Sequence, residues 1–131
     1  MKITSRHVAL ALAVAATALA PATALAKGGS DDDEMRAAGS CSGRSSAKFK
    51  VKPDDGRLEA EFEVDQNRNG VTWSVRLRSG GRVLVSMRAT TKAPSGSFSV
   101  ERRIADAAGR NRISATATSP SGEVCRASVT A

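Results

Sequence analysis

The chain has few of the side chains on which most enzymes and stacking-based binders depend. It contains no tyrosine, one tryptophan, three phenylalanines and one histidine among 131 residues. The histidine, His7, lies in an N-terminal segment that we expect to be removed, which excludes histidine triads, histidine general bases and histidine metal sites from the rest. Few aromatic rings leave few faces for stacking on bases or sugars. The sequence therefore predicts no enzyme, no cofactor and no sequence-specific nucleic-acid partner.

Residues 1–26 have the composition of a secretory signal peptide. Lys2 and Arg6 form a positive start, a run of small and apolar residues follows, and Ala24-Leu25-Ala26 supplies a small-x-small cleavage motif. The apolar run is too short and too rich in alanine for a transmembrane helix. We expect cleavage after Ala26 and a secreted, extracellular protein without a membrane span in its mature form.

Two cysteines, Cys41 and Cys125, lie near opposite ends of the remaining chain. An even number of cysteines in an exported protein indicates a disulfide, because thiols outside the cytosol meet an oxidising environment. Closing so long a loop would stabilise the fold by about 4.5 kcal/mol in the chain-entropy model. Two unpaired thiols are the alternative.

The chain is basic, with a formal net charge of +7. The acidic run Asp31-Asp32-Asp33-Glu34 lies within residues 27–40, which are small, polar and charged. We expect a disordered linker there and a more basic folded domain at 41–131. A basic surface attracts polyanions at low ionic strength, although it also serves the solubility of a secreted domain.

From Lys48 onward, apolar residues alternate with polar ones, which indicates β-strands with one buried face. The first two strands flank a Pro-Asp-Asp-Gly turn. A four-residue loop at 53–56 would place Val51 opposite Leu58, Lys50 opposite Glu59 and Lys48 opposite Glu61. We therefore expect these glutamates to be partners in surface ladders, not catalytic acids.

Trp73, the only tryptophan, lies in the clearest alternating segment, residues 71–78. The alternation puts it on the buried face, so we predict that it is the centre of the core and not a platform for ligands. After this strand, a three-residue loop at 80–82 aligns Leu77 with Val85 on the buried side. The predicted core consists of Trp73, Phe49, Phe62, Val75, Leu77, Phe98 and Ile113.

Residues 65–70 match the first half of a calcium-binding loop, with Asp65, Asn67 and Asn69 as oxygen donors. The twelfth position, which supplies a bidentate glutamate in such loops, is Arg76. A cation there would repel the ion, so the sequence favours an Asn-Gly turn and no metal.

Seven short strands separated by turns over residues 41–131 predict an all-β antiparallel sandwich with one disulfide. Trp73 on the third strand and the segment Asp106-x-x-Gly109-x-Asn111-x-Ile113-x-Ala115-x-Ala117 resemble immunoglobulin-like and fibronectin type III-like modules of bacterial exported proteins. More narrowly, the chain is similar to small, uncharacterised secreted proteins of high-GC Gram-positive bacteria. It departs from immunoglobulin domains in the position of its disulfide and in lacking a tyrosine corner. The resemblance implies a seven-stranded immunoglobulin-like β-sandwich and no particular function.

Three functions fit these features. The leading expectation is a secreted, non-enzymatic interaction module that binds an extracellular partner of unknown identity through loops or an unpaired strand edge. The first alternative is a cationic binder of cell-surface or environmental polyanions. The second is an inhibitor of a secreted protease, with Lys92 as the bait residue in a segment stiffened only by Pro94. The arginines expected to contact a polyanion are Arg76, Arg78, Arg82, Arg88, Arg102, Arg103, Arg110 and Arg112.

Overall fold

A computed structural model describes residues 33–131, which form nine β-strands and no helix. The strands are β1 (Met35–Ala38), β2 (Ser40–Cys41), β3 (Ser46–Asp54), β4 (Arg57–Asp65), β5 (Thr72–Ser79), β6 (Arg82–Thr90), β7 (Ser97–Ala105), β8 (Arg112–Thr118) and β9 (Val124–Thr130). The predicted signal peptide and residues 27–32 of the predicted linker lie outside the described residues. The prediction of an all-β fold is confirmed.

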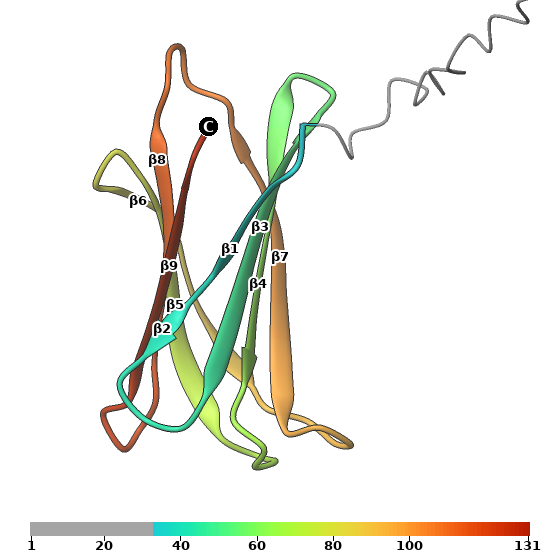
Figure 1. The fold of residues 1–131 in the computed structure, drawn as a ribbon, viewed down its shortest axis with the longest axis vertical. Coiled ribbons are helices and arrows are strands. Elements are labelled where there is room, and N and C mark those ends of the chain that lie inside the picture. The colour runs from blue at the N-terminus through green and yellow to red at the C-terminus, as the bar shows by residue number, and fades with distance from the viewer. Residues whose placement is uncertain (1–32) are drawn as a thin grey trace, which may run out of the picture.

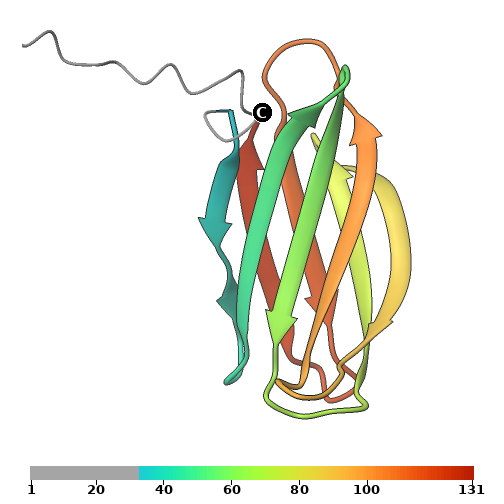
Figure 2. The ribbon, with the colours of Figure 1, turned by 90° about the vertical axis from the view of Figure 1, so that its right-hand side faces the viewer.

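The strands form two antiparallel sheets, which lie side by side in Figure 1. The strand order is β1-β3-β4-β7 in the four-stranded sheet and β2-β9-β8-β5-β6 in the five-stranded sheet. Figure 2 shows the four-stranded sheet from its outer side, with strands of the five-stranded sheet behind it. Each sheet buries one face against the other, which explains the alternation of apolar and polar residues along the strands. The predicted antiparallel sandwich is confirmed, with nine strands instead of seven.

The two additional strands are formed by residues for which the sequence predicts a linker. β1 pairs with the edge of β3 and β2 pairs with the edge of β9, so this segment crosses from one sheet to the other (Figure 1). Gly39 lies at the crossing, where its amide N–H donates to the Ala47 carbonyl at 2.8 Å and an added Cβ would lie 2.7 Å from the Ala47 Cβ. The linker prediction is wrong for residues 35–40, because backbone pairing at a sheet edge needs no apolar pattern in the added strand.

The hairpin of β3 and β4 has a shorter turn than the sequence predicts. The turn consists of Asp55 and Gly56, which both have positive φ, 48° and 74°. This is the geometry of a two-residue hairpin turn, for which Asp-Gly is a favoured sequence. Val51 therefore lies opposite Ala60, and each lysine of β3, Lys52 included, faces a glutamate of β4. The predicted register is wrong by two residues, a shift that keeps every side chain on its predicted face.

The hairpin of β5 and β6 combines a tight turn with a β-bulge. The turn is Gly80-Gly81, with φ of 57° and 86°, and is one residue shorter than predicted. The register then shifts between Leu77 and Arg78, which leaves Leu84 of β6 without a partner on β5. This bulge compensates for the shorter turn. The predicted alignment of Leu77 with Val85 is therefore confirmed, although the predicted loop length is wrong.

The core lies between the sheets, and the seven residues predicted for it are all at most 6% exposed. Phe49 and Phe62 meet edge to face with ring centroids 5.9 Å apart, and Trp73 packs against Phe98 at 6.1 Å. The indole N–H of Trp73 donates to Oε1 of Gln66 at 3.0 Å, which satisfies the one polar group of this buried ring. Burial of each large side chain stabilises the fold by about 1.5–3 kcal/mol.

Cys41 and Cys125 form the predicted disulfide. They are opposite residues in the pairing of β2 with β9, and their Cα atoms lie 4.0 Å apart. Cys125 is fully buried and the bridge closes a separation of 84 residues. The disulfide therefore ties β2 to β9, the last strand of the chain, with a stabilisation of about 4.5 kcal/mol in the chain-entropy model.

Candidate functional site

The outer face of the five-stranded sheet carries mainly arginine, serine and threonine side chains, with Val83 and Val124 as apolar exceptions. The outward positions of β5 and β8 are all arginine, serine or threonine, because the apolar residues take the inward positions. β6 and β9 add two further outward arginines, and the five strands contain neither aspartate nor glutamate. We call this surface the arginine face, and its arginines are Arg76, Arg78, Arg88, Arg112 and Arg126.

Strand pairing brings residues that are distant in the sequence into rows across the arginine face. Arg126 of β9 lies opposite Thr116 of β8, which lies opposite Arg76 of β5. Arg78 occupies the next row, opposite Ser114. Neighbouring strands lie about 4.8 Å apart and alternate residues of one strand about 6.7 Å apart. The face therefore concentrates positive charge from four strands in a small area, which raises the potential that an anion meets there.

A shallow depression with a volume of about 710 Å³ lies on the arginine face. The side chains that line it include Arg78, Arg112, Arg126, Ser114, Thr116 and Ser128. A second depression of about 320 Å³ on the same face is lined by residues that include Arg88, Ser74 and Thr118. Guanidinium groups and hydroxyls both donate hydrogen bonds to the oxygens of phosphate, sulfate or carboxylate. Both hollows therefore present donors suited to an anionic ligand.

No ion pair of residues 33–131 joins an arginine of this face to a carboxylate. In the described part of the chain, the ion pairs join Arg36, Lys50, Lys52 and Arg103 to carboxylates and include no arginine of the arginine face. Of the five, only Arg78 is half-buried and the others are exposed. Their donors are therefore available to a ligand from solution.

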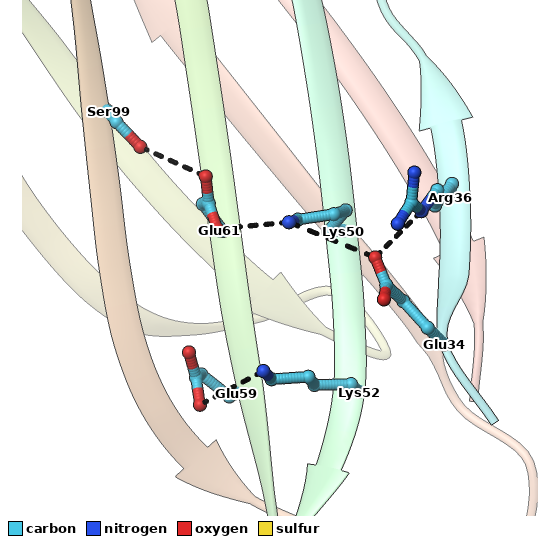
Figure 3. A network of polar contacts seen from close by, with 7 residues as sticks. All are labelled: Glu34, Arg36, Lys50, Lys52, Glu59, Glu61 and Ser99. Atoms are coloured by element: carbon cyan, nitrogen blue, oxygen red, sulfur yellow. Dashed lines mark hydrogen bonds and ion pairs between the residues drawn. The ribbon is translucent and has the colours of Figure 1, made fainter. Parts of the chain in front are cut away.

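The outer face of the four-stranded sheet has the opposite arrangement, in which cations and carboxylates alternate. Lys50 Nζ lies 3.4 Å from Glu61 Oε2 and 3.9 Å from Glu34 Oε1, while Lys52 Nζ lies 4.0 Å from Glu59 Oε2 (Figure 3). The pairs with Glu61 and Glu59 follow from the register of β3 with β4, whereas Glu34 precedes β1. Positive charge on this face is thus largely balanced by the protein itself.

Two carboxyl groups of the four-stranded sheet side have shifted pKa values. The hydrogen bond from Arg36 Nε to Glu34 Oε1, 2.7 Å long, holds the pKa of Glu34 below its ordinary value of 4.5. A hydrogen bond with Glu59 and the repulsion between the two carboxylates raise the pKa of Glu101 above 4.5. Glu59 and Glu101 therefore form a local concentration of negative charge on the four-stranded sheet.

The structure separates the eight arginines that the sequence suggests for polyanion contact. Four of them lie together on the arginine face, namely Arg76, Arg78, Arg88 and Arg112. Arg82 begins β6 opposite Ser79 at the end of the hairpin, and Arg110 lies in the loop between β7 and β8. Sequence position alone does not show which sheet a strand joins, so it could not make this division.

The remaining two arginines of that set, Arg102 and Arg103, lie on β7 in the four-stranded sheet. Arg103 Nε is 3.3 Å from Asp54 Oδ2, and Arg102 Nη1 donates to the Glu101 carbonyl at 2.8 Å. By the alternation of β7, Arg102 is at an inward position, yet it is exposed. A charged residue at an inward position of an edge strand discourages pairing with another chain, which gives Arg102 a structural role.

Sequence reasoning missed Arg126, the fifth arginine of the arginine face. The available signal was the alternation of β9, in which Arg126 follows the inward Cys125 and so points outward. Its place beside Thr116 and in line with Arg76 depends on the order β9-β8-β5, which is a tertiary property.

Internal hydrogen bonds hold the loop between β4 and β5 that partly matches a calcium site. Asp65 Oδ1 accepts from the Asn67 amide at 3.0 Å, and Thr91 Oγ1 donates to the Arg68 carbonyl at 2.6 Å and accepts from the Val71 amide at 3.0 Å. Within residues 33–131, no group of three or more histidine, cysteine, aspartate and glutamate residues could hold a metal ion. The calcium alternative gains no support from this geometry.

The proposed bait residue Lys92 lies in a tight turn between β6 and β7. Its amide N–H donates to the Ser97 carbonyl at 2.9 Å, and its carbonyl accepts from the Gly96 amide at 2.9 Å. Recognition of an extended peptide uses main-chain groups of that peptide. Both main-chain groups of Lys92 are already engaged, so the geometry does not favour a protease inhibitor.

Comparisons of the chain with protein-family models, with curated proteins and with solved structures find no match. Among residues 33–131, no helix has the length and apolar character needed to cross a membrane. The chemistry of the arginine face is therefore the main guide to function.

Proposed function

We propose that the chain is a secreted, non-enzymatic interaction module of the immunoglobulin-like or fibronectin type III-like class, which binds linear polyanions through the arginine face. The observation that carries this proposal is the segregation of charge between the two sheets. One outer face balances its cations with carboxylates, whereas the other presents Arg76, Arg78, Arg88, Arg112 and Arg126 without any acidic residue in its strands.

The strand order supports the assignment to this class of sandwich. Without the N-terminal strands β1 and β2, seven strands remain, of which the first, second and fifth form one sheet as β3-β4-β7. The other four form the second sheet as β6-β5-β8-β9. Immunoglobulin constant-type sandwiches likewise have their first, second and fifth strands in one sheet and their third, sixth and seventh in the other, and they differ only in the sheet that the fourth strand joins. Because such sandwiches host unrelated functions, the functional proposal rests on the arginine face and not on the fold.

Secretion and the lack of enzymatic activity rest on separate observations. The disulfide between Cys41 and Cys125 supports an oxidising compartment, in agreement with the signal peptide expected at residues 1–26. After residue 26 the chain has no histidine, and the cysteines are paired. The carboxylates of the four-stranded sheet face cations or other carboxylates at its surface, which is the environment of structural ion pairs.

Charge complementarity supports a polyanionic ligand. Arginine binds phosphate and sulfate groups through two parallel N–H bonds, and the serine and threonine hydroxyls beside it add further donors. The aromatic residues Trp73, Phe49, Phe62 and Phe98 are all buried, so no ring is available for stacking on bases or sugars. Binding should therefore be electrostatic and should weaken as salt concentration rises.

Retention on immobilised heparin at increasing salt concentration tests this proposal. The double variant R76S/R78S should elute at lower salt than the wild type. Its slope of log affinity against log salt should fall by about 0.7–0.9 for each phosphate or sulfate group that the variant no longer binds. The matched control R102S/R103S removes the same charge from the four-stranded sheet and should elute with the wild type.

An equal loss of retention in the two double variants would mean that net charge alone governs binding, which contradicts a binding site on the arginine face. Salt-insensitive capture of a single extracellular protein, with no retention on heparin, would favour the protein-binding module instead. Melting temperatures of both variants, measured by circular dichroism, show whether each remains folded.

A further inference from the structure

Four residues of the arginine face form a diagonal line across three neighbouring strands. Arg88 of β6 lies opposite Ser74, one row from Arg76 on β5. Arg78 is the next outward residue of β5, and Arg112 of β8 lies one row beyond it. We call Arg88, Arg76, Arg78 and Arg112 the arginine line. With the usual spacing of strands and of residues, its members are about 7–8 Å apart and the line spans about 22 Å.

Each member of the arginine line has a hydroxyl-bearing residue as its partner on a neighbouring strand. These pairs are Arg88 with Ser74, Arg76 with Ser86 and Thr116, Arg78 with Ser114, and Arg112 with Thr130. A guanidinium group beside a hydroxyl can bind an anionic oxygen and a neighbouring alcohol at the same time. The arginine line therefore presents, about every 7–8 Å, a site that can bind both an anionic group and a neighbouring alcohol.

The interval matches the repeat of a polymer whose phosphates are joined by three-carbon units. Three covalent backbone bonds of an extended chain advance roughly 3.3–3.6 Å, so six such bonds advance about 7 Å. Phosphorus atoms linked through oxygen, three carbons and oxygen are six bonds apart. Four such phosphates span about 21 Å when the chain is extended, close to the length of the arginine line.

We propose that the arginine face binds a linear polyol phosphate, with one phosphodiester at each arginine of the arginine line and the polyol hydroxyls beside the serines and threonines. This inference rests on the proposed function and names the chemical class of its ligand. A single strand of nucleic acid has the same six-bond repeat, but it usually gains affinity by stacking its bases on aromatic rings. The aromatic residues of this chain are buried, which favours a polymer without bases.

A length series of synthetic glycerol phosphate oligomers tests the number of phosphates that the site holds. The affinity, measured by titration calorimetry at low salt, should rise steeply from two phosphates to four. For oligomers with more than four phosphates, the affinity should rise only in proportion to the number of four-phosphate segments that can occupy the arginine line. A steep rise that continues well beyond four phosphates would overturn the assignment of the line as the site.

A charge relocation separates the geometry of the line from the total charge of the face. The double variant R76T/T118R keeps the net charge and moves one cation to Thr118, an exposed outward position of β8 whose partners are Ser74 and Val124. It leaves a gap of about 14 Å between Arg88 and Arg78. The affinity for the four-phosphate oligomer should fall about tenfold, and the salt slope should be smaller by about one. The control R102T, which lowers the net charge on the other sheet, should stay within about twofold of the wild type.

The outcomes distinguish this inference from the function on which it rests. Wild-type affinity in R76T/T118R, together with loss of heparin retention in R76S/R78S, would overturn the arginine line and leave the polyanion-binding face in place. Unchanged binding in both variants would overturn both. Tighter binding of a thymidine oligonucleotide or a heparin oligosaccharide with four charges, compared with the glycerol phosphate oligomer, would overturn the choice of a polyol phosphate. A melting temperature close to the wild-type value confirms that R76T/T118R is folded.

Discussion

On the outer face of the four-stranded sheet each lysine of β3 faces a glutamate of β4, whereas on the five-stranded sheet the arginines face serine and threonine, with Val83 as a second partner of Arg78. The inward faces of the two sheets are alike, because both present valine, alanine, larger aliphatic and aromatic residues to one core. The core therefore does not require the difference between the outer faces. Outward side chains of a sandwich face solvent and do not pack in the core, so their charge can serve a function other than packing.

The two outer faces also differ in what they contribute to stability. Oppositely charged pairs across neighbouring strands, such as Lys50 with Glu61 and Lys52 with Glu59, contribute roughly 0.2–1 kcal/mol each. The arginine face forgoes such pairs and places like charges at about 7–8 Å from one another. The four-stranded sheet pairs opposite charges across its strands, and the arginine face does not. Such a departure from a stabilising pattern is expected where residues serve binding.

The largest effect is expected from a change in the core that supports both faces. Trp73→Ala should lower the free energy of unfolding by about 3–5 kcal/mol, because it removes a fully buried ring and leaves a cavity. Urea titration followed by far-ultraviolet circular dichroism measures this loss. In the wild type, tryptophan fluorescence should be blue-shifted and protected from an aqueous quencher. An undiminished unfolding free energy in the variant would contradict the burial of Trp73.

The next effect concerns the disulfide, which belongs to the five-stranded sheet alone. Replacing both cysteines, as C41S/C125S, should destabilise the protein by about 2–4 kcal/mol because the unfolded chain regains the freedom of a long loop. Hydrogen exchange should show loss of protection in β2 and β9 before loss in the β3 and β4 hairpin. In the wild type, labelling of both cysteines by a thiol reagent under native conditions would contradict the bridge.

A smaller effect should follow when the arginine face is made to resemble the other one. Thr116→Glu places a carboxylate between Arg126 and Arg76, its partners on the two neighbouring strands. The affinity for heparin should fall about tenfold, while the free energy of unfolding changes by only a few tenths of a kcal/mol, because cross-strand ion pairs are weak at exposed positions. Thr116→Gln has the same shape without the charge and should bind nearly as the wild type does. Equal losses in both variants would mean that steric change, not charge, weakens binding.

The smallest effect lies in the carboxylate cluster of the four-stranded sheet. The pKa of Glu101 is raised in the folded state, so its contribution to stability is present below its ordinary value of 4.5 and is lost as pH rises through the folded-state pKa. Glu101→Gln removes the repulsion with Glu59 and should slightly raise the melting temperature at pH 7. The difference from the wild type should vanish at a pH well below 4.5. A larger difference at low pH than at neutral pH would contradict this sign.

The register of the two long hairpins shows how far local patterns extend. Alternation placed the residues of β3 and β4 on their correct faces but left the turn length open, so a shift of two residues went undetected. In the second hairpin, the alignment of Leu77 with Val85 was predictable because both residues are apolar. The bulge at Leu84 was not predictable, because the alternation of apolar and polar residues does not show which residue lacks a partner on the neighbouring strand.

By itself, the sequence determined which way most side chains of this protein face, since a period of two residues is a local property of each strand. It thereby determined the buried position of Trp73, the outward position of the arginines and the pairing of the two cysteines. Only the tertiary structure decided that β8 lies beside β5, that β1 and β2 join the sheet edges, and that Arg102 and Arg103 lie on the other sheet. Strand order depends on contacts between segments far apart in the chain, whose pattern leaves no local trace, and for this reason the arginine face becomes visible only in the folded molecule.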